Sequence, residues 1–169
     1  MTRRFFWFTI YCLFFITVML IGVEASFAQN KKDIKANKVK SSSETIVATE
    51  NGKEITYKDN DVTYDKNGNS LEETQYNKDG TVLKKKTMKY DSNKNKIEEM
   101  EYEGKILTKK HQYSYNGNGD KILEVIYDGA GKLIKKEVYI YNAKGLKVEK
   151  KIYDVGNTLV ESHKFTYGM

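Results

Sequence analysis

Tyrosines recur at a fixed interval along most of the chain, and this spacing constrains the fold more than any other feature. One set, separated by 26, 25, 26 and 26 residues, consists of Tyr64, Tyr90, Tyr115, Tyr141 and Tyr167. A second set lies between them at intervals of 26, 25 and 26 residues, at Tyr76, Tyr102, Tyr127 and Tyr153. A fixed period of this length indicates that one structural unit is repeated four times.

Each unit reads as two strands and two turns. Successive tyrosines are 12 to 14 residues apart, which is too short for a helix plus a strand and fits one strand followed by a short turn. In the third unit the first turn begins Tyr115-Asn116 and the second Tyr127-Asp128, and each has a glycine four residues after its tyrosine. Asp or Asn can hydrogen-bond within its own turn, and glycine supplies the positive φ that closes it. Each unit is therefore predicted to be a β-hairpin.

A further hairpin is expected before the repeats, because Asn51-Gly52 is the dipeptide that best accommodates a tight turn between two strands. Apolar residues occur on both strand faces, as at the neighbours Val125 and Ile126, and wide open sheets usually curl. The predicted fold is all-β: an antiparallel meander of about ten strands built from four 26-residue β-hairpin repeats, forming a curled single sheet or half-barrel.

The hairpin register is predicted from complementary charges facing each other across the second turn of each unit. Pairing Tyr76 with Thr81 and Tyr102 with Lys105 sets the first two registers. The expected opposite-charge pairs are Glu73 with Lys84, Glu72 with Lys85, Glu98 with Lys109, Glu124 with Lys135, and Lys150 with Glu161. The expected apolar pairs include Met100 with Leu107 and Ile152 with Leu159.

The N-terminus has the features of an export signal. Two arginines precede an apolar run, and Ser26-Phe27-Ala28 supplies the small residues read by a signal peptidase. We expect residues 1–28 to be a signal peptide cleaved after Ala28, residues 29–43 a flexible linker, and residues 44–169 the β-hairpin repeat domain. The expected location is periplasmic or secreted. An uncleaved leader remains open as a membrane anchor, since the run is long enough to span a bilayer.

Composition and charge narrow the range of possible partners. Residues 29–169 contain no cysteine, so no disulfide stabilises the expected domain. The net charge of +6 lies mostly in the leader and linker, and the repeats are close to neutral. Arginine, the residue suited to bidentate phosphate contacts, is absent after the leader. These features and the export signal argue against nucleic acid as a partner.

The tyrosine-bearing face is the candidate binding surface. Tyrosines of the first set end alternate strands along one rim, and Met88, Tyr113, Tyr139 and Phe165 lie two residues earlier on the same face. The candidate ligand-binding residues are Tyr90, Tyr113, Tyr115, Tyr139, Tyr141, Phe165 and Tyr167. Such a row suits a glycan or peptide, and it equally suits tyrosines that only pack, because every copy carries them.

The other sequence patterns give weaker evidence of a functional site. The lysine clusters at residues 84–86, 109–110, 135–136 and 150–151 are expected to pair with acids on neighbouring strands. Turns such as Asp65-x-Asn67-x-Asn69 open like a calcium loop but lack its closing acidic residue, so turn chemistry explains them. No cysteine nucleophile, paired histidine or phosphate loop points to catalysis. We expect no enzyme activity, no catalytic residue, no metal and no cofactor.

Turns such as Tyr64-Asp65-Lys66-Asn67-Gly68 and Tyr127-Asp128-Gly129-Ala130-Gly131 resemble the YD repeats of RHS-type secreted shell proteins, over residues 64–167. The layout is also similar to small exported bacterial repeat proteins of uncharacterised families. This resemblance implies a β-hairpin repeat and an extracytoplasmic address, and it transfers no catalytic residue.

The sequence therefore favours an exported, non-enzymatic repeat protein that binds a partner protein or an envelope glycan through its tyrosine-bearing face. The alternative is a structural or adhesive component of the cell envelope with no discrete ligand site.

Overall fold

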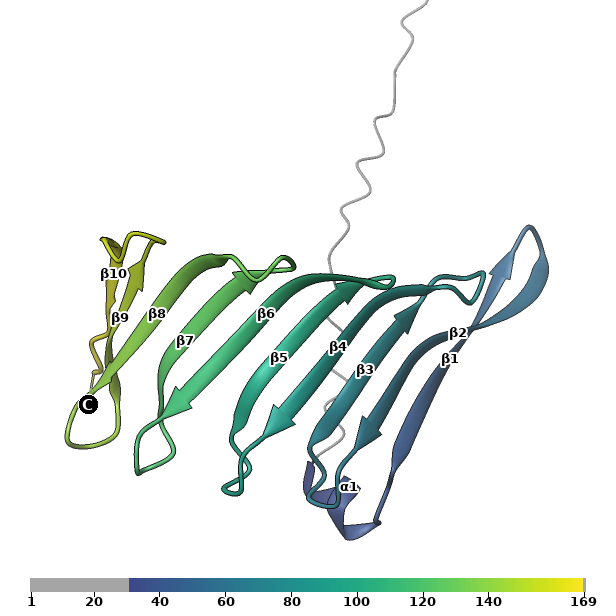
Figure 1. Ribbon diagram of the computed structural model, residues 1–169. Coiled ribbons are helices and arrows are strands. Elements are labelled where there is room, and N and C mark those ends of the chain that lie inside the picture. Colours follow the sequence, from purple (N-terminus) through teal and green to yellow (C-terminus); the bar gives the residue numbers. More distant parts are fainter. Residues whose placement is uncertain (1–30, 169) are drawn as a thin grey trace, which may run out of the picture.

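The fold is a single antiparallel sheet (Figure 1). The computed structural model describes residues 31–168. Its elements are α1 (Lys31–Ala36), β1 (Ser41–Glu50), β2 (Lys53–Tyr64), β3 (Ser70–Tyr76), β4 (Val82–Tyr90), β5 (Lys96–Glu103), β6 (Ile106–Tyr115), β7 (Lys121–Asp128), β8 (Leu133–Tyr141), β9 (Lys147–Tyr153) and β10 (Leu159–Lys164). The ten strands follow one another in sequence order from β1 to β10. The predicted all-β meander is confirmed.

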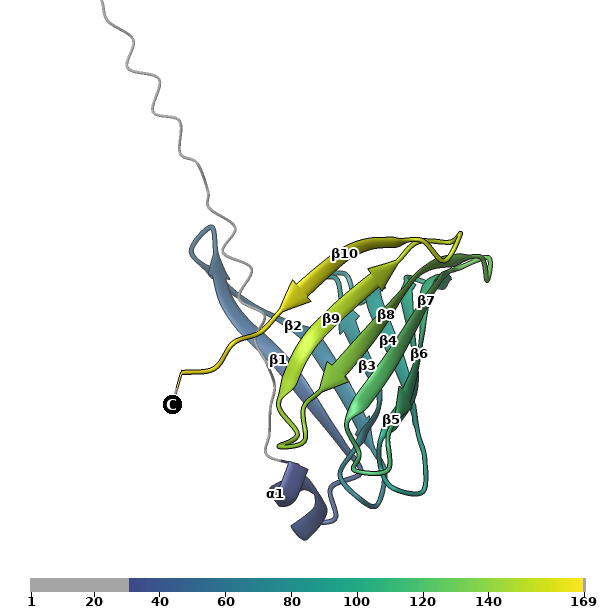
Figure 2. The same ribbon diagram turned by 90° about the vertical axis from the view of Figure 1, so that its left-hand side faces the viewer.

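The sheet is curled rather than flat (Figures 1 and 2). Strands β9 and β10 turn out of the plane of the middle strands, and β1 and β10 remain as its two unpaired edges. In β4 to β8 the buried residues Met88, Glu99, Ile126, Glu137 and Tyr139 share one face, as their cross-strand pairing requires. Side chains crowd together on the inside of a curl. The burial pattern therefore indicates that this face, called the carboxylate face below, lines the inside.

The turns adopt the conformation that the sequence predicts. Gly68, Gly80, Gly119, Gly131 and Gly145, each four residues after a tyrosine, all have positive φ. Lys94 and Asn157 occupy the same turn position and also have positive φ, at 70° and 63°. Asn51 and Gly52 have positive φ as well, as expected of the tight turn between β1 and β2.

The predicted hairpin register is wrong by two residues in three repeats and by three in the second. Glu124 lies opposite Glu137 rather than Lys135, and Lys135 lies opposite Ile126. The other shifted pairs are Glu73 with Lys86, Glu98 with Gln112, Met100 with Lys110, Lys150 with His163, and Ile152 with Glu161. Among the expected charge pairs, Glu72 and Lys85 form an ion pair at 2.7 Å, although they are not directly opposite.

Two local features cause this shift. In the first unit, the second turn closes on Asn77 and Thr81, whose backbone hydrogen bond is 2.8 Å, so Tyr76 faces Val82 rather than Thr81. A β-bulge then places Leu83 outside the pairing, because Gln75 faces Lys84. A bulge adds one residue to one strand and moves every later pair by one. Similar register shifts recur at every later hairpin.

Residues 31–43 differ from the expected flexible linker. They contain α1 and the first three residues of β1, and Ile34 of α1 is almost completely buried. A Cβ built on Gly68 would lie 2.6 Å from the Lys31 carbonyl oxygen, so α1 packs closely on the first repeat turn. The ordered region therefore begins before residue 44. The predicted signal peptide lies outside the described residues.

Candidate functional site

The tyrosines of the first set close the sheet at its lower end in Figure 1. Four of their hydroxyls donate to main-chain carbonyl oxygens on the preceding strand: Tyr90 to Ser70 (2.9 Å), Tyr115 to Lys96 (2.7 Å), Tyr141 to Lys121 (2.9 Å) and Tyr167 to Lys147 (2.7 Å). The Tyr64 hydroxyl instead shares a hydrogen bond with the Ser42 hydroxyl at 3.0 Å. The β3–β4 pairing begins only at Glu72, so the Ser70 carbonyl lies beyond the backbone ladder. A tyrosine hydroxyl thus replaces the missing ladder hydrogen bond.

Lysines and aromatic rings alternate across the carboxylate face. The Nζ atoms lie over ring centroids in five contacts: Lys96 over Tyr113 (5.3 Å), Lys121 over Tyr113 (5.2 Å) and Tyr139 (4.6 Å), and Lys147 over Tyr139 (4.9 Å) and Phe165 (5.9 Å). Each lysine is the first residue of its strand. Tyr113 and Tyr139 lie two residues before the ends of β6 and β8, and Phe165 directly follows the last residue of β10. These contacts are within cation–π range. This row of six residues is called the lysine–aromatic ladder.

Carboxylates lie behind this ladder. Glu124 and Glu137 are directly opposite on β7 and β8, an arrangement of like charges that destabilises a sheet unless it is compensated. The Tyr139 hydroxyl donates to both, at 3.2 Å to Glu124 and 2.8 Å to Glu137. Lys121 contacts Glu124 at 2.7 Å and Lys135 contacts Glu137 at 2.6 Å. The repulsion is therefore offset by one shared donor and two cations.

These contacts set the acidity of the buried carboxyls. Burial alone raises the pKa of Glu124, but hydrogen bonds from Lys121 and His111 and their nearby charge more than offset it, and the net pKa is lowered. Glu137 behaves similarly, with Lys135 and Tyr139 outweighing burial to lower its pKa. Burial and the neighbouring carboxylates raise the pKa of Tyr139, so its hydroxyl stays a donor. Glu124 and Glu137 are anionic at neutral pH.

His111 is held within the same group. Its Nδ1 lies 2.9 Å from Glu124 Oε1, and because a carboxylate only accepts, Nδ1 carries the proton. Its Nε2 is buried and has no hydrogen-bond partner among residues 31–168. A nitrogen enclosed in this way is not open to a substrate. The geometry gives His111 a packing role beside Tyr113, whose ring is stacked on it at 6.2 Å.

The structure separates the seven predicted binding residues into two groups. Tyr90, Tyr115, Tyr141 and Tyr167 lie at the lower rim, and Tyr113, Tyr139 and Phe165 lie in the ladder. Tyr139 is only 7% exposed, whereas Phe165 and Tyr167 are 39% and 50% exposed. The aromatic surface open to a ligand is therefore concentrated at the β10 end of the sheet.

The turn at residues 142–146 departs from the three equivalent turns. In those turns the fifth residue is polar and its side chain bonds to the first: Asn69 with Asp65 (2.7 Å), Asn95 with Asp91 (3.2 Å) and Asp120 with Asn116 (3.0 Å). In the fourth turn the fifth residue is Leu146, which offers no such bond to Asn142. The Asn142 Oδ1 still accepts from the backbone N–H groups of Lys144 (2.9 Å) and Leu146 (3.1 Å). The turn keeps its shape and gains an apolar side chain.

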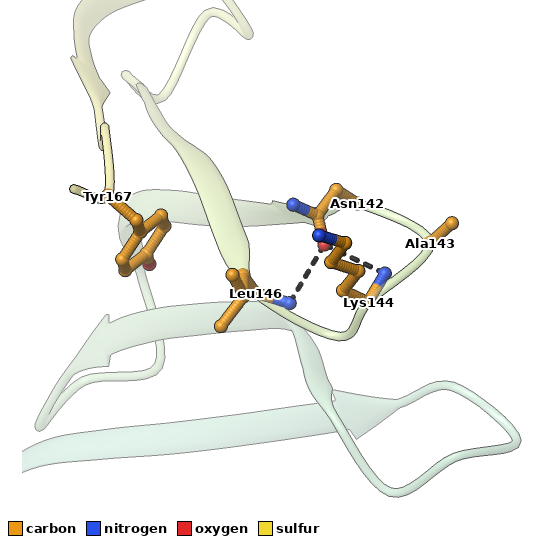
Figure 3. A pocket seen from close by; sticks show the side chains of 5 residues that line it. All are labelled: Asn142, Ala143, Lys144, Leu146 and Tyr167. Carbon is orange, nitrogen blue, oxygen red and sulfur yellow. Dashed lines mark hydrogen bonds between the residues drawn. The ribbon is translucent and has the colours of Figure 1, made fainter. Parts of the chain in front are cut away.

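Leu146 lines a hollow at the end of the sheet (Figure 3). Its volume is about 420 Å³, and its lining is Asn142, Ala143, Lys144, Leu146 and Tyr167. The Tyr167 ring stands on one side and Leu146 and its turn on the other. An apolar concavity with a few polar groups at its margin has the character of a small-ligand site. Comparing the four turns residue by residue would have identified Leu146 from the sequence.

The calcium-like turns use their oxygens internally. Asp65 Oδ1 accepts from the backbone N–H groups of Asn67 (2.7 Å) and Asn69 (2.9 Å), and these bonds lower the Asp65 pKa despite its burial. Across residues 31–168, no group of three or more His, Asp or Glu side chains is arranged to hold a metal ion. Over the same span, no helix is long and apolar enough to cross a membrane.

No family model matches the chain, and no curated protein matches it. Among solved structures, a protein of unknown function from Bacteroides fragilis is 16% identical, with a TM-score of 0.41 over 77% of this chain and 96% of that one. The crystal structure of TarM is 19% identical, with a TM-score of 0.32 over 77% of this chain. A Staphylococcus aureus TarM mutant in complex with fondaparinux, alpha-GlcNAc-glycerol and UDP gives 18% identity and a TM-score of 0.31. This chain spans about a fifth of TarM, with 22% of it covered.

Proposed function

We propose that this protein is an exported, non-enzymatic binding protein that takes a cell-envelope glycan at the β10 end of its sheet. The observation that carries the proposal is the hollow beside Tyr167, which is lined by Leu146 in place of the polar residue of the other turns. The rest of the carboxylate face holds the sheet together through its ladder and ion pairs. The free aromatic surface belongs to Phe165 and Tyr167.

The chemistry of the hollow supports a sugar ring as ligand. Carbohydrates present an apolar face that packs on an aromatic ring and hydroxyls that need polar partners. Tyr167 supplies the ring and Leu146 adds apolar area, while Asn142 and Lys144 place polar groups at the margin. A peptide of a partner protein is the competing ligand for the same surface, and a structural envelope component would bind neither.

The test is binding of soluble envelope glycan fragments to the full-length chain, first on an array and then by calorimetry. Leu146→Asn restores the residue found at Asn69 and Asn95, so the fold is expected to be retained. We expect it to weaken glycan binding about tenfold or more, because it removes the apolar wall. Leu71→Asn is the matched control, since Leu71 has nearly the same exposure and lies in β3, away from the hollow, and it is expected to bind normally.

Two results would contradict the proposal. Saturable binding that Leu146→Asn leaves unchanged would move the site elsewhere, and no binding to any fragment would favour the structural alternative. The glycan is expected to have the same length before and after incubation with the protein, because the proposal includes no reaction.

A further inference from the structure

The open edge of β10 has the pattern of a surface that pairs with itself. Every residue of β10 except His163 is exposed, although β10 occupies the same place in its hairpin as the well-covered β8. An unpaired edge presents a row of free N–H and C=O groups that invites another strand. The exposed apolar residues Leu159, Val160 and Phe165 lie along this edge.

The backbone of β10 determines which residues can pair. Phe165 donates its N–H to Val148 O on β9 at 3.0 Å, so its polar groups point inward. Neighbouring residues of a strand direct these groups to opposite edges. The N–H and C=O groups of Ser162 and Lys164 therefore point to the open edge. An antiparallel partner must use those residues as its hydrogen-bonded positions.

We propose that two copies of this chain dimerise through β10, antiparallel, with Ser162 opposite the same residue of the second copy. This register places Glu161 opposite His163 of the other copy, twice by symmetry. It also places Leu159 opposite Phe165. Moving the register by two residues in either direction sets Glu161 against itself or His163 against itself. Only the central register places each Glu161 carboxylate opposite an imidazole, and the two groups carry opposite charges when His163 is protonated.

The side chains of Glu161 and His163 are positioned to contact their counterparts in the second copy. His163 Nε2 lies 2.7 Å from Glu161 Oε1 within one chain, so in the protonated ring Nδ1–H is the donor that remains for Glu161 of the second copy. Both side chains are on the carboxylate face, and that of Glu161 is 55% exposed and that of His163 41%. A two-fold axis perpendicular to the sheet keeps the same face on the same side in both copies. The dimer therefore continues the curl as one sheet of twenty strands, twice the ten strands of each copy.

The other edge lacks this complementarity. The charged residues of β1 are Glu44 and Glu50, so no register of β1 with itself brings opposite charges together. Charged residues usually protect an open edge. In β10 the Glu161 carboxylate and the His163 imidazole instead face each other under two-fold symmetry. Lys164 faces the opposite side of the sheet, away from this pair.

The experiment is sedimentation velocity of the full-length chain over a range of concentrations, which should show a monomer–dimer equilibrium. Ser162→Pro removes the outward N–H without removing a hydrogen bond to β9, and it is expected to abolish the dimer. Ser162→Ala is the matched control, because it loses only the hydroxyl, which bonds to Glu149 within the chain at 2.9 Å. It is expected to dimerise normally.

A charge exchange tests the register independently of folding. His163→Glu alone sets two carboxylates against each other at both pairs and is expected to weaken dimerisation about tenfold. Combining His163→Glu with Glu161→Lys restores opposite charges and is expected to restore the dimer. The proposal would be overturned by a monomer at all concentrations, by a dimer that Ser162→Pro leaves intact, or by species larger than dimers. Larger species would indicate head-to-tail addition of β10 to β1. The proposal is separate from glycan binding, since Leu146→Asn does not alter β10.

Discussion

Tyr139 and Phe165 occupy the same position in successive repeats, yet their surroundings differ. Tyr139 is 7% exposed, lies between Lys121 and Lys147, and hydrogen-bonds two carboxylates. Phe165 is 39% exposed and contacts one lysine of the ladder, Lys147, at 5.9 Å. The difference arises because β8 lies between β7 and β9, whereas β10 is an edge strand of the sheet within residues 31–168. A repeat position is structural where a later strand covers it and is open where the sheet ends.

Replacing each ring by alanine gives the largest expected effect. Tyr139→Ala should lower the free energy of unfolding by about 3 kcal/mol, since it removes a buried ring and leaves Glu124 facing Glu137 without a shared donor. Phe165→Ala should lower it by about 1 kcal/mol, because Phe165 is much less buried, at 39% exposed. Urea denaturation followed by circular dichroism measures both. Equal losses would mean that the strand order does not determine the role of this position.

Acidification tests the covered strands in a second way. Hydrogen bonds and charges of neighbouring lysines outweigh burial and lower the pKa values of Glu99, Glu124 and Glu137, on β5, β7 and β8, below the ordinary value of a glutamate carboxyl. A lowered pKa contributes stability that is present above about 4.5 and is lost as the pH falls through the lower folded value. Urea midpoints should therefore fall progressively below that pH.

Glu124→Gln is the variant for this test. It should be less stable than the parent at neutral pH and should show a shallower loss in acid, because one of the titrating groups has been removed. If the urea midpoint of the variant changed with pH as steeply as that of the parent, Glu124 would not contribute to the loss of stability in acid.

The smallest effect concerns the turns, where the inner and terminal repeats are alike. Lys94 in an inner turn and Asn157 in the last turn both adopt positive φ. Lys94→Gly should stabilise the chain by about 1 kcal/mol, the typical relief of left-handed strain. Asn157→Gly should gain less, since Asn tolerates this region. Thermal unfolding measures both, and a loss of stability in either would show that the lost side chain matters more than the backbone.

Much of the fold could be predicted because its signals are local. The Asn51-Gly52 turn, the glycines four residues after tyrosines and the strand-length spacing each depend on a few neighbouring residues, and all are confirmed. The register could not be predicted in the same way. Leu83 and Ile134 look like ordinary strand residues in the sequence, but each is the extra residue of a bulge. Charge pairing alone does not reveal a bulge, since neighbouring registers also bring lysines near glutamates.

The candidate site was predicted in part. The aromatic positions of the ladder were recognised, but the lysines Lys96, Lys121 and Lys147 were not assigned to it, although each begins its strand and precedes an apolar residue. The hollow was missed because Leu146 is notable only by comparison with Asn69, Asn95 and Asp120.

The sequence by itself determined that this chain forms hairpins in a meander, because tyrosine spacing and turn residues act over short distances along the backbone. Tertiary structure alone decided which side chains face one another and which aromatic residues stay open. Those outcomes depend on bulges that the charge pattern does not reveal, and on the curl of the sheet and the position of its last strand, which no single repeat contains.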